Sequence, residues 1–399
     1  MVRKWMIAIL CSLVLLANST MASAETEIIQ VSNLKTLEEV CQHYEELVFE
    51  GNQSMDYATF QVELGYRIPG SEASAKLINS FSENATGYEV STPSHYVDGM
   101  NATNLIAKYS PENSTGEVVI IAAHCDSRDR AERDENPDLR ENPIDGANDG
   151  ASGVGVLFEL LPIIPNMNLS HDVWLILFDA EDQGVTPSML GSKAWAENLT
   201  QEEIDTISAF ILLDMVGDID FNFRKEMLST PILWDTMLNI TTALGFVDGE
   251  LDCLGEQGSD VYNLNKVPVW IQDDHVSATN VGIPAIDIID VNYGDETILG
   301  GYFHTTNDTL DKISAESLGK AGKIVELGLR SGSWIDYQPS FVEIVNSTTN
   351  NTEEEIVETK IFSAFEKIVI TSQIILIIGI VVSIRIIKSI ELASRPRTK

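Results

Sequence analysis

Short apolar runs alternate along the chain with longer stretches in which apolar residues recur at helical spacing. The apolar runs predict strands at residues 103–108, 117–123, 172–178, 208–213 and 284–289. Helices are expected between them at about 150–162, 187–199, 230–245 and 314–336. This alternation predicts an α/β fold of three layers, α/β/α, in which helices cover both faces of a mostly parallel central sheet.

The segment before this pattern, residues 25–100, is expected to form helices and loops. The stretch LKTLEEVCQHYEELVF has helical periodicity, and GYRIPGS has the composition of a loop rich in turns. No internal repeat accompanies these elements. In sheets of the predicted kind, functional groups gather beyond the carboxyl ends of the strands, so those ends are where candidate chemistry is sought.

Both ends of the chain carry an apolar segment. The first has a basic start, an apolar centre and the small residues ASA before Glu25, which predicts a secretory signal peptide. The second begins at Ile368 and with its flanks reaches about the twenty residues that a membrane-spanning helix needs, although a buried core helix is the alternative. Arginine and lysine residues follow it, which places the C-terminus in the cytoplasm by the positive-inside rule.

These features predict a single-pass membrane protein at the cell surface, with the catalytic domain outside. The predicted parts are a signal peptide (1–24), an ectodomain (25–337), a flexible polar stalk (338–366), a transmembrane helix (367–387) and a basic cytoplasmic tail (388–399). Acceptor tripeptides for N-glycosylation fit an exported chain, and they begin at Asn52, Asn84, Asn101, Asn113, Asn198 and Asn346, among others.

Composition narrows the class of protein. A hydrophobic content of 44% over 399 residues is that of a globular chain, and the net charge of -36 argues against a nucleic-acid partner. After removal of the signal peptide, Cys41, Cys125 and Cys253 remain. Three cysteines make neither a disulfide framework nor a cysteine zinc site, and they allow at most one bridge.

Carboxylates and imidazoles follow several predicted strands. The strand at 172–178 runs into Glu181 and Asp182, whose adjacent negative charges require a compensating cation or a wet cleft. Other such residues are His124 and Asp126 in HCDS, Asp149 in GANDGASG, Asp214 after FILL, and His304 in YFHTTNDT. Zinc accepts ligands of these types, and it would offset their mutual repulsion.

Each of these motifs alone has a simpler interpretation. A lone His-x-Asp is more often a surface turn or a buried hydrogen-bonded pair, and GANDGASG alone fits a flexible loop that caps the next helix. Their common order at five strand ends is much harder to obtain by chance, so the set as a whole is what indicates a metal site.

The set resembles the secreted zinc aminopeptidases of phosphorylase/hydrolase-like fold and their relatives, the glutaminyl cyclases of animal and bacterial type, over about residues 55–337. The aminopeptidase pattern implies two zinc ions bridged by Asp149. His124 and Asp214 would complete the shell of one ion, and Asp182 and His304 that of the other. Glu181 would be the general base, and Asp126 would orient His124.

The cyclase pattern implies one zinc ion, held by Asp149, Asp182 and His304. The segment WIQDDHVSATNVGIPAIDIID is similar to a cyclase segment with a Gln-Asp pair and a following histidine, matched by Gln272, Asp273 and His275. The simpler interpretation of the Gln-Asp pair is a helix cap. Two positions depart from the cyclases, which have a tryptophan just beyond the paired acids and another before the final histidine. Here these neighbourhoods read QGVTPS and Phe303.

The sequence thus predicts a zinc-dependent enzyme that acts on peptide N-termini. Cyclisation of N-terminal glutamine with release of ammonia is favoured, with one zinc ion and with Glu181, Asp214 and Asp273 as catalytic residues. The alternatives are a dizinc aminopeptidase that hydrolyses the first peptide bond, and a non-catalytic, receptor-like ectodomain.

Overall fold

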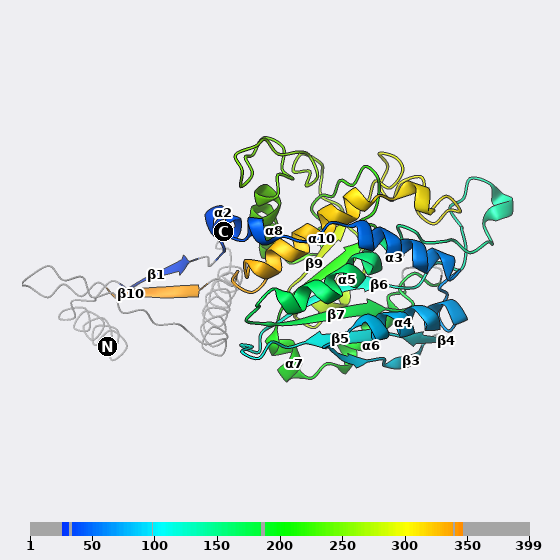
Figure 1. Ribbon diagram of the computed structural model, residues 1–399, viewed down its shortest axis with the longest axis horizontal. Helices are drawn as coiled ribbons and strands as arrows, with labels where there is room; N and C mark the ends of the chain where they lie inside the picture. The colour runs from blue at the N-terminus through cyan, green and yellow to red at the C-terminus, as the bar shows by residue number, and fades with distance from the viewer. Residues whose placement is uncertain (1–25, 32–33, 98, 185–187, 338–339, 346–399) are drawn as a thin grey trace, which may run out of the picture. The chain divides into compact units, whose positions relative to one another are not determined.

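The structure is a computed structural model, and it describes residues 26–31, 34–97, 99–184, 188–337 and 340–345. The chain divides into two compact units. In the smaller one, β1 (Thr26–Val31) pairs antiparallel with β10 (Ser340–Val345), a strand that falls within the predicted stalk. The larger unit begins at Leu34 and contains the central sheet with its helices (Figure 1).

Six strands form the central sheet in the order β2-β5-β7-β6-β8-β9. The four strands β6 to β9 run parallel to one another, whereas β5 pairs antiparallel with β7 and β2 pairs antiparallel with β5. The strands are β2 (Glu89–Ser91), β5 (Leu105–Tyr109), β6 (Val118–His124), β7 (Asp172–Phe178), β8 (Ile207–Asp214) and β9 (Ala285–Ile289).

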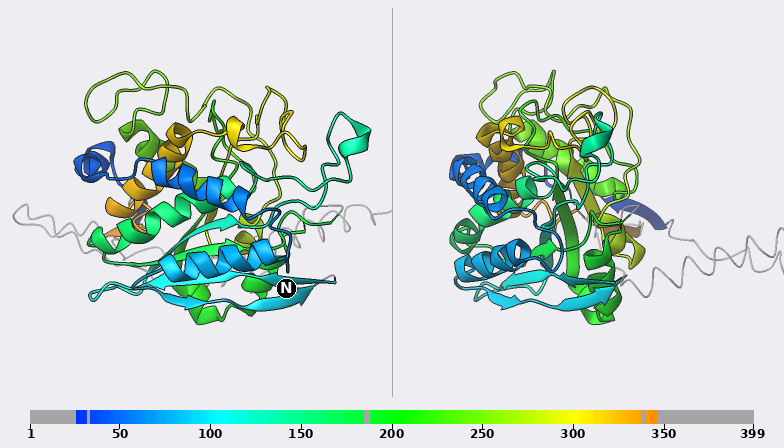
Figure 2. Two further views of the ribbon diagram at one scale, coloured as in Figure 1. Left: turned by 45° about the vertical axis from the view of Figure 1, so that its right-hand side comes forward. Right: turned by 90° about the vertical axis from the view of Figure 1, so that its right-hand side faces the viewer.

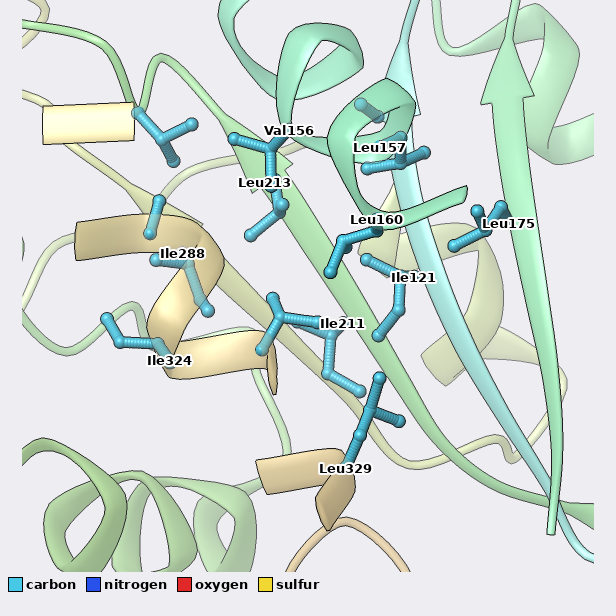
Figure 3. Packing of buried hydrophobic residues seen from close by; sticks show 14 of the residues in the cluster. Ile121, Val156, Leu157, Leu160, Leu175, Ile211, Leu213, Ile288, Ile324 and Leu329 are labelled. Atoms are coloured by element: carbon cyan, nitrogen blue, oxygen red, sulfur yellow. The ribbon is translucent and has the colours of Figure 1, made fainter. Parts of the chain in front are cut away.

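Helices cover both faces of this sheet because its central strands are apolar on both faces. Successive side chains of a strand point to opposite faces. Ile121 and Ile211 accordingly pack with Leu160 in one core cluster (Figure 3), whereas Ile120 and Phe210 belong to another. The first cluster involves helices that lie on one side of the sheet (Figure 2), and these include α4 (Glu72–Asn84), α5 (Ala151–Ile163), α8 (Pro231–Ala243) and α10 (Ala315–Arg330).

The opposite face is covered by shorter helices. Its core cluster contains Trp195 of α6 (Leu190–Asn198) and Ala278 of α9 (His275–Asn280), and α7 (Gln201–Thr206) leads directly into β8. The predicted three-layer α/β/α architecture with a mostly parallel sheet is therefore confirmed. The five predicted strands correspond to β5 to β9, and their ends agree to within about two residues.

The N-terminal part of the body contains more strand than the sequence predicted. Its helices include α2 (Leu37–Cys41) and α3 (Asn52–Glu63), as expected. The hairpin of β3 (Ser94–Val97) and β4 (Met100–Thr103) was missed, although the sequence Asp98-Gly99 between its strands is a strong hairpin signal.

One disulfide bridge joins Cys41, at the end of α2, to Cys253, in the loop region after α8. Cys125 is a buried free thiol immediately after β6. The expectation of at most one bridge is consistent with this pairing. The bridge spans 212 residues of sequence and fastens the first helix of the body to a distant loop.

The predicted location as a single-pass protein of the cell surface is wrong. In the described part of the chain, no helix is both long and apolar enough to cross a membrane. The longest helix there, α10, has 16 residues, and a spanning helix needs about 20. The same finding removes support for the membrane as a partner. The predicted signal peptide, transmembrane helix and basic tail lie outside the described residues, and the remaining domain boundaries stay predictions.

Candidate active site

The carboxyl ends of three neighbouring parallel strands bring the predicted residues together. His124 is the last residue of β6 and Asp214 the last of β8, and these two strands are direct neighbours. Glu181 and Asp182 follow β7, which pairs with the other edge of β6. Residues far apart in sequence therefore meet at one edge of the sheet, as expected for this architecture.

Asp149, Asp182 and His304 form one group of candidate metal ligands. One ligand atom from each lies within 4.8 Å of the others. Nε2 of His304 is 2.9 Å from Oδ1 of Asp182 and 3.6 Å from Oδ2 of Asp149. All three residues are buried, so their side chains form a compact cluster of two carboxylates and one imidazole.

A second group shares Asp149 with the first. Nε2 of His124 lies 3.1 Å from Oδ1 of Asp149 and 3.2 Å from Oδ1 of Asp214. These three ligand atoms also lie within 4.8 Å of one another. Asp149 therefore stands between two candidate metal positions, which is the arrangement that a bridging carboxylate requires.

The donor set fits zinc. Oδ2 of Asp149 and Oδ2 of Asp182 are buried and accept no hydrogen bond from the described residues. A buried carboxylate oxygen without a partner is costly, and a cation at this position would satisfy both atoms. Histidine nitrogen with aspartate oxygens is a ligand combination typical of zinc.

The backbone around Asp149 explains the glycine-rich motif. Gly150 has φ of 98°, a conformation that favours glycine, and a Cβ there would lie 2.7 Å from the carbonyl oxygen of Asp126 and 3.0 Å from Cε1 of His124. Asp308 accepts hydrogen bonds from the backbone N–H groups of Asn148 (2.8 Å) and Asp149 (3.2 Å). The sequence analysis missed this role of Asp308, although it lies in the quoted motif YFHTTNDT.

Asp126 supports the site from behind. Its Oδ1 is 3.5 Å from Nδ1 of His124, and it accepts hydrogen bonds from the backbone N–H groups of Glu181 (3.0 Å) and Asp182 (3.1 Å). One buried carboxylate thus contacts a candidate ligand from β6 and also fixes the turn after β7. The second of these contacts was not predicted.

The charged loop after Asp126 contributes two residues that the sequence analysis did not single out. Arg128 donates to Glu132 at 2.7 Å and to Oδ1 of Asp182 at 3.2 Å. Glu132 in turn accepts a hydrogen bond from Nδ1 of His304 at 2.7 Å. The pair Arg128 and Glu132 therefore connects two candidate ligands of the first group. A run of alternating charges in the sequence gives no sign of which members turn inward.

Burial and mutual charge shift the protonation of this cluster. Burial and the charge of Asp273 raise the pKa of Glu181 well above its usual range. Burial and the charge of Asp214 raise the pKa of Asp273 to about 8. Burial also raises the pKa of Asp214, and the carboxyl groups of Asp214 and Asp273 act on each other, so each affects the protonation of the other.

A cavity of about 330 Å³ opens over these groups. The predicted residues that line it are Asp149, Glu181, Asp182, Asp214, Gln272, Asp273, Phe303 and His304. Trp270, which the sequence analysis did not single out, lines it as well. A larger cavity of about 540 Å³ lies elsewhere and contains none of the candidate ligands, so it is not the centre of this chemistry.

Phe303 and His275, both predicted as site residues, occupy different surroundings. The ring of Phe303 stacks on that of His304 with centroids 3.6 Å apart. His275 is fully buried outside the cavity lining, where its Nε2 is 3.0 Å from Oε2 of Glu226. The interpretation of Gln272 and Asp273 as a helix cap is not confirmed, because the residue at the N-cap position of α9 is Asp274.

Left-handed backbone conformations are concentrated at this site. Ala180, Met215 and His304 have φ of 58°, 46° and 55°. Ala180 precedes Glu181, Met215 follows Asp214, and His304 is itself a candidate ligand. Such conformations are costly for residues other than glycine and persist only where the surroundings hold them, as functional sites often do.

Comparisons with known proteins agree with this geometry. The model of Peptidase family M28 matches residues 104–327. Among solved structures, a Zn-dependent exopeptidase from Parabacteroides distasonis is 30% identical with a TM-score of 0.61, and the match covers 71% of this chain and 98% of that one. A glutaminyl cyclase from Bacteroides thetaiotaomicron is 28% identical with a TM-score of 0.62 at the same coverage.

A relative of known sequence is Aminopeptidase YwaD from Bacillus subtilis, which is 25% identical over 231 residues. This match covers 56% of the present chain but only 43% of the Bacillus protein. The chain therefore spans less than half of that relative.

Proposed function

The chain belongs to peptidase family M28, and from this premise we propose that it is a zinc-dependent glutaminyl-peptide cyclotransferase. It would close an N-terminal glutamine of a peptide to pyroglutamate and release ammonia. An exopeptidase, a glutaminyl cyclase and an aminopeptidase among the relatives support a peptide or protein N-terminus as the substrate. These relatives are enzymes, which argues against a receptor-like ectodomain.

Zinc is the metal that this site would hold. The relative from Parabacteroides is described as Zn-dependent, and the donor set of Asp149, Asp182 and His304 is suited to the same ion. When bound, the ion acts as a Lewis acid that polarises the carbonyl group of the substrate's side-chain amide. The remaining roles fall to groups of the chain itself.

Glu181 is placed to move the proton. It lines the cavity beside Asp182, and burial raises its pKa, which suits a carboxylate that takes up a proton and returns it near neutral pH. In the reaction, the substrate's α-amine nitrogen forms a bond to the carbonyl carbon (Cδ) of the glutamine side-chain amide, and the bond from that carbon to the amide nitrogen breaks. Glu181 accepts a proton from the amine and delivers it to the departing nitrogen, which leaves as ammonia.

One observation carries the choice of cyclisation. Asp273 is a second buried carboxyl group that lines the cavity with Asp214, a residue that a dizinc site would use as a ligand, and burial together with the charge of Asp214 raises its pKa to about 8. Two acids of which one keeps its proton would offer the cavity both a hydrogen-bond donor and an acceptor, which suits an uncharged amide and its leaving group. Gln272, in the same cavity lining, adds a neutral amide beside this pair.

A dizinc aminopeptidase is the second candidate, and the geometry of His124 favours it. With Asp149 and Asp214, this residue forms a complete second group of possible ligands. In that case Glu181 would activate a water molecule, and water rather than the substrate's amine would attack the first peptide carbonyl. The two candidates share the metal position of the first group, the base and the recognition of an α-amine.

The variant Asp273→Ala tests the choice between them. The proposed function predicts that it strongly lowers ammonia release from glutamine-initiated peptides while the zinc content per chain stays at the wild-type level. A variant that loses zinc together with activity would assign Asp273 to the support of a metal ligand. Full activity of the variant would show that Asp273 has no part in the reaction and would contradict the argument for cyclisation.

A further inference from the structure

Trp270 is an exposed aromatic residue at the mouth of the candidate active site. Its side chain is 70% exposed, and it lines the same cavity as Glu181 and Asp182. Aromatic side chains contribute most to stability or binding when their large apolar surface is covered. An indole left in water makes no such contribution. A tryptophan that is exposed at a site mouth therefore has the character of a contact surface for a ligand.

The backbone holds this indole outward. Val269 donates to the carbonyl of Lys225 at 3.0 Å and accepts from the N–H of Met227 at 2.8 Å, and its own side chain is buried. The N–H of Ile271 donates to Oε1 of Glu226 at 3.1 Å. Trp270 lies between two anchored residues, and alternation along this extended segment directs its side chain away from the core. The backbone on either side of Trp270 is therefore held by hydrogen bonds.

Part of the cavity lining suits an apolar ligand group. The cavity lining also includes the apolar residues Ile271, Leu299 and Phe303, which pack against one hydrophobic cluster. Arg133 also lines the cavity, with its guanidinium carbon 5.1 Å from the ring centroid of Phe303. An exposed tryptophan face attracts cations as well, and so do the carboxylates of the same lining, so a lysine side chain is the competing ligand in the test.

The position of Trp270 along the chain indicates which substrate residue it meets. It precedes Gln272 by two residues, so their Cα atoms are at most about 7 Å apart. A peptide in extended conformation advances about 3.3 Å per residue, so a span of at most about 7 Å covers one or two residues beyond the terminal one. The cavity of about 330 Å³ is at the small end for a ligand site, which leaves the next residue at its rim.

We propose that Trp270 forms a binding subsite for an aromatic or large apolar side chain at the second position of the peptide substrate. This inference rests on the proposed action at peptide N-termini, and it holds for either reaction there. It extends the substrate from a bare terminal residue to a terminal residue followed by an apolar one.

The test compares Trp270→Ala with wild type on peptide amides that begin Gln-Phe, Gln-Ala and Gln-Lys. Loss of an aromatic contact is expected to lower kcat/KM on Gln-Phe by about five- to tenfold, mainly through KM. The value on Gln-Ala should stay within about twofold. Tyr96→Ala is the matched control, because Tyr96 is 76% exposed and lies in β3 away from this cavity.

Equal losses on all three peptides, no loss on any, or a loss confined to Gln-Lys would each overturn the subsite. Failure of the proposed reaction is distinguished by a wild-type protein that releases no ammonia from any peptide. The same comparison is then made with Leu-Phe and Leu-Ala peptides and release of leucine, where the subsite again predicts a selective loss on the Phe-containing peptide. Direct binding is followed by the fluorescence of Trp270 in the Glu181→Gln variant, which should change with Gln-Phe and not in Trp270→Ala.

Discussion

Glu132 accepts a hydrogen bond from His304 across 172 residues of sequence, at 2.7 Å between Oε1 and Nδ1. This contact leaves Nε2 of His304, which faces Asp182 at 2.9 Å, as the nitrogen available to a metal. A hydrogen bond of this kind orients the imidazole ring and raises its basicity as a ligand. Arg128 extends the contact to Asp182, so a single loop supports two of the three candidate zinc ligands.

Glu132→Ala is therefore expected to weaken zinc binding by about 10- to 100-fold, which is typical for loss of a residue that orients a metal ligand. Competition with a chelator measures the affinity without reference to activity. Glu132→Gln should recover most of it, because its amide oxygen can still accept the hydrogen bond. Glu135→Ala is the control, since Glu135 is an exposed residue of the same loop. Equal affinity of Glu132→Ala and wild type would show that this contact does not support a zinc ligand.

Zinc binding is expected to depend on pH in a defined direction. In the metal-free protein, burial lowers the pKa of His304, but the neighbouring charge of Asp182 outweighs this and raises it to about 9. Burial and the charge of Asp149 raise the pKa of Asp182 to about 6. Between about pH 6 and about pH 9, zinc must displace one proton from His304, so apparent affinity should rise about tenfold per pH unit.

Titration calorimetry in buffers of different ionisation enthalpy measures the protons released. Near neutral pH the expected result is about one proton per zinc ion from this group. The same raised pKa of His304 makes the protonated histidine a stabilising group in the metal-free fold, fully so below its ordinary value of 6.5 and no longer above about 9. Zinc affinity that does not vary across this range would contradict the assignment of His304 as a ligand.

The paired acids after β7 should separate binding from catalysis. Glu181→Gln removes a proton acceptor but no ligand, so we expect turnover to be lost with zinc content near normal. Asp182→Ala removes a ligand and should lose zinc as well as turnover. Metal analysis of the two purified variants distinguishes these outcomes, and zinc loss in Glu181→Gln equal to that in Asp182→Ala would mean that the two roles are reversed.

The disulfide between Cys41 and Cys253 is expected to contribute to stability. It restricts the unfolded chain across a separation of 212 residues. Replacing both cysteines by serine should lower the free energy of unfolding by about 2–4 kcal/mol. Urea denaturation measures this difference, with the reduced wild-type protein as the control. Unchanged stability would indicate that contacts between α2 and α8 hold this part of the body without the bridge.

The elements that sequence patterns predicted well are those whose environment is uniform. Strands such as β6 and β7 are buried on both faces over nearly their whole length, so their residues are almost all apolar and their ends are sharp. His124 and Asp214 were predictable as neighbours because each ends such a strand. The expectation that these two side chains meet needed only the parallel arrangement of neighbouring strands.

The contributions of loops were not predictable in the same way. Arg128 and Glu132 lie in a run of charged residues whose other members, such as Glu135, are exposed, and no periodicity separates the two kinds. Trp270 is directed outward by main-chain hydrogen bonds of its neighbours, which composition does not reveal. His275 resembled a site residue, yet it is fully buried beside Glu226.

The fate of a glutamine-initiated peptide tests the central claim most directly. Purified protein with measured zinc is incubated separately with a glutamine-initiated and a leucine-initiated peptide, and ammonia and free amino acids are both quantified. The proposed function predicts ammonia and a peptide that keeps its first residue as pyroglutamate, with one tightly held zinc ion per chain and no free leucine. Release of free leucine with two tightly held zinc ions per chain, and no ammonia, would contradict it and make the protein an aminopeptidase.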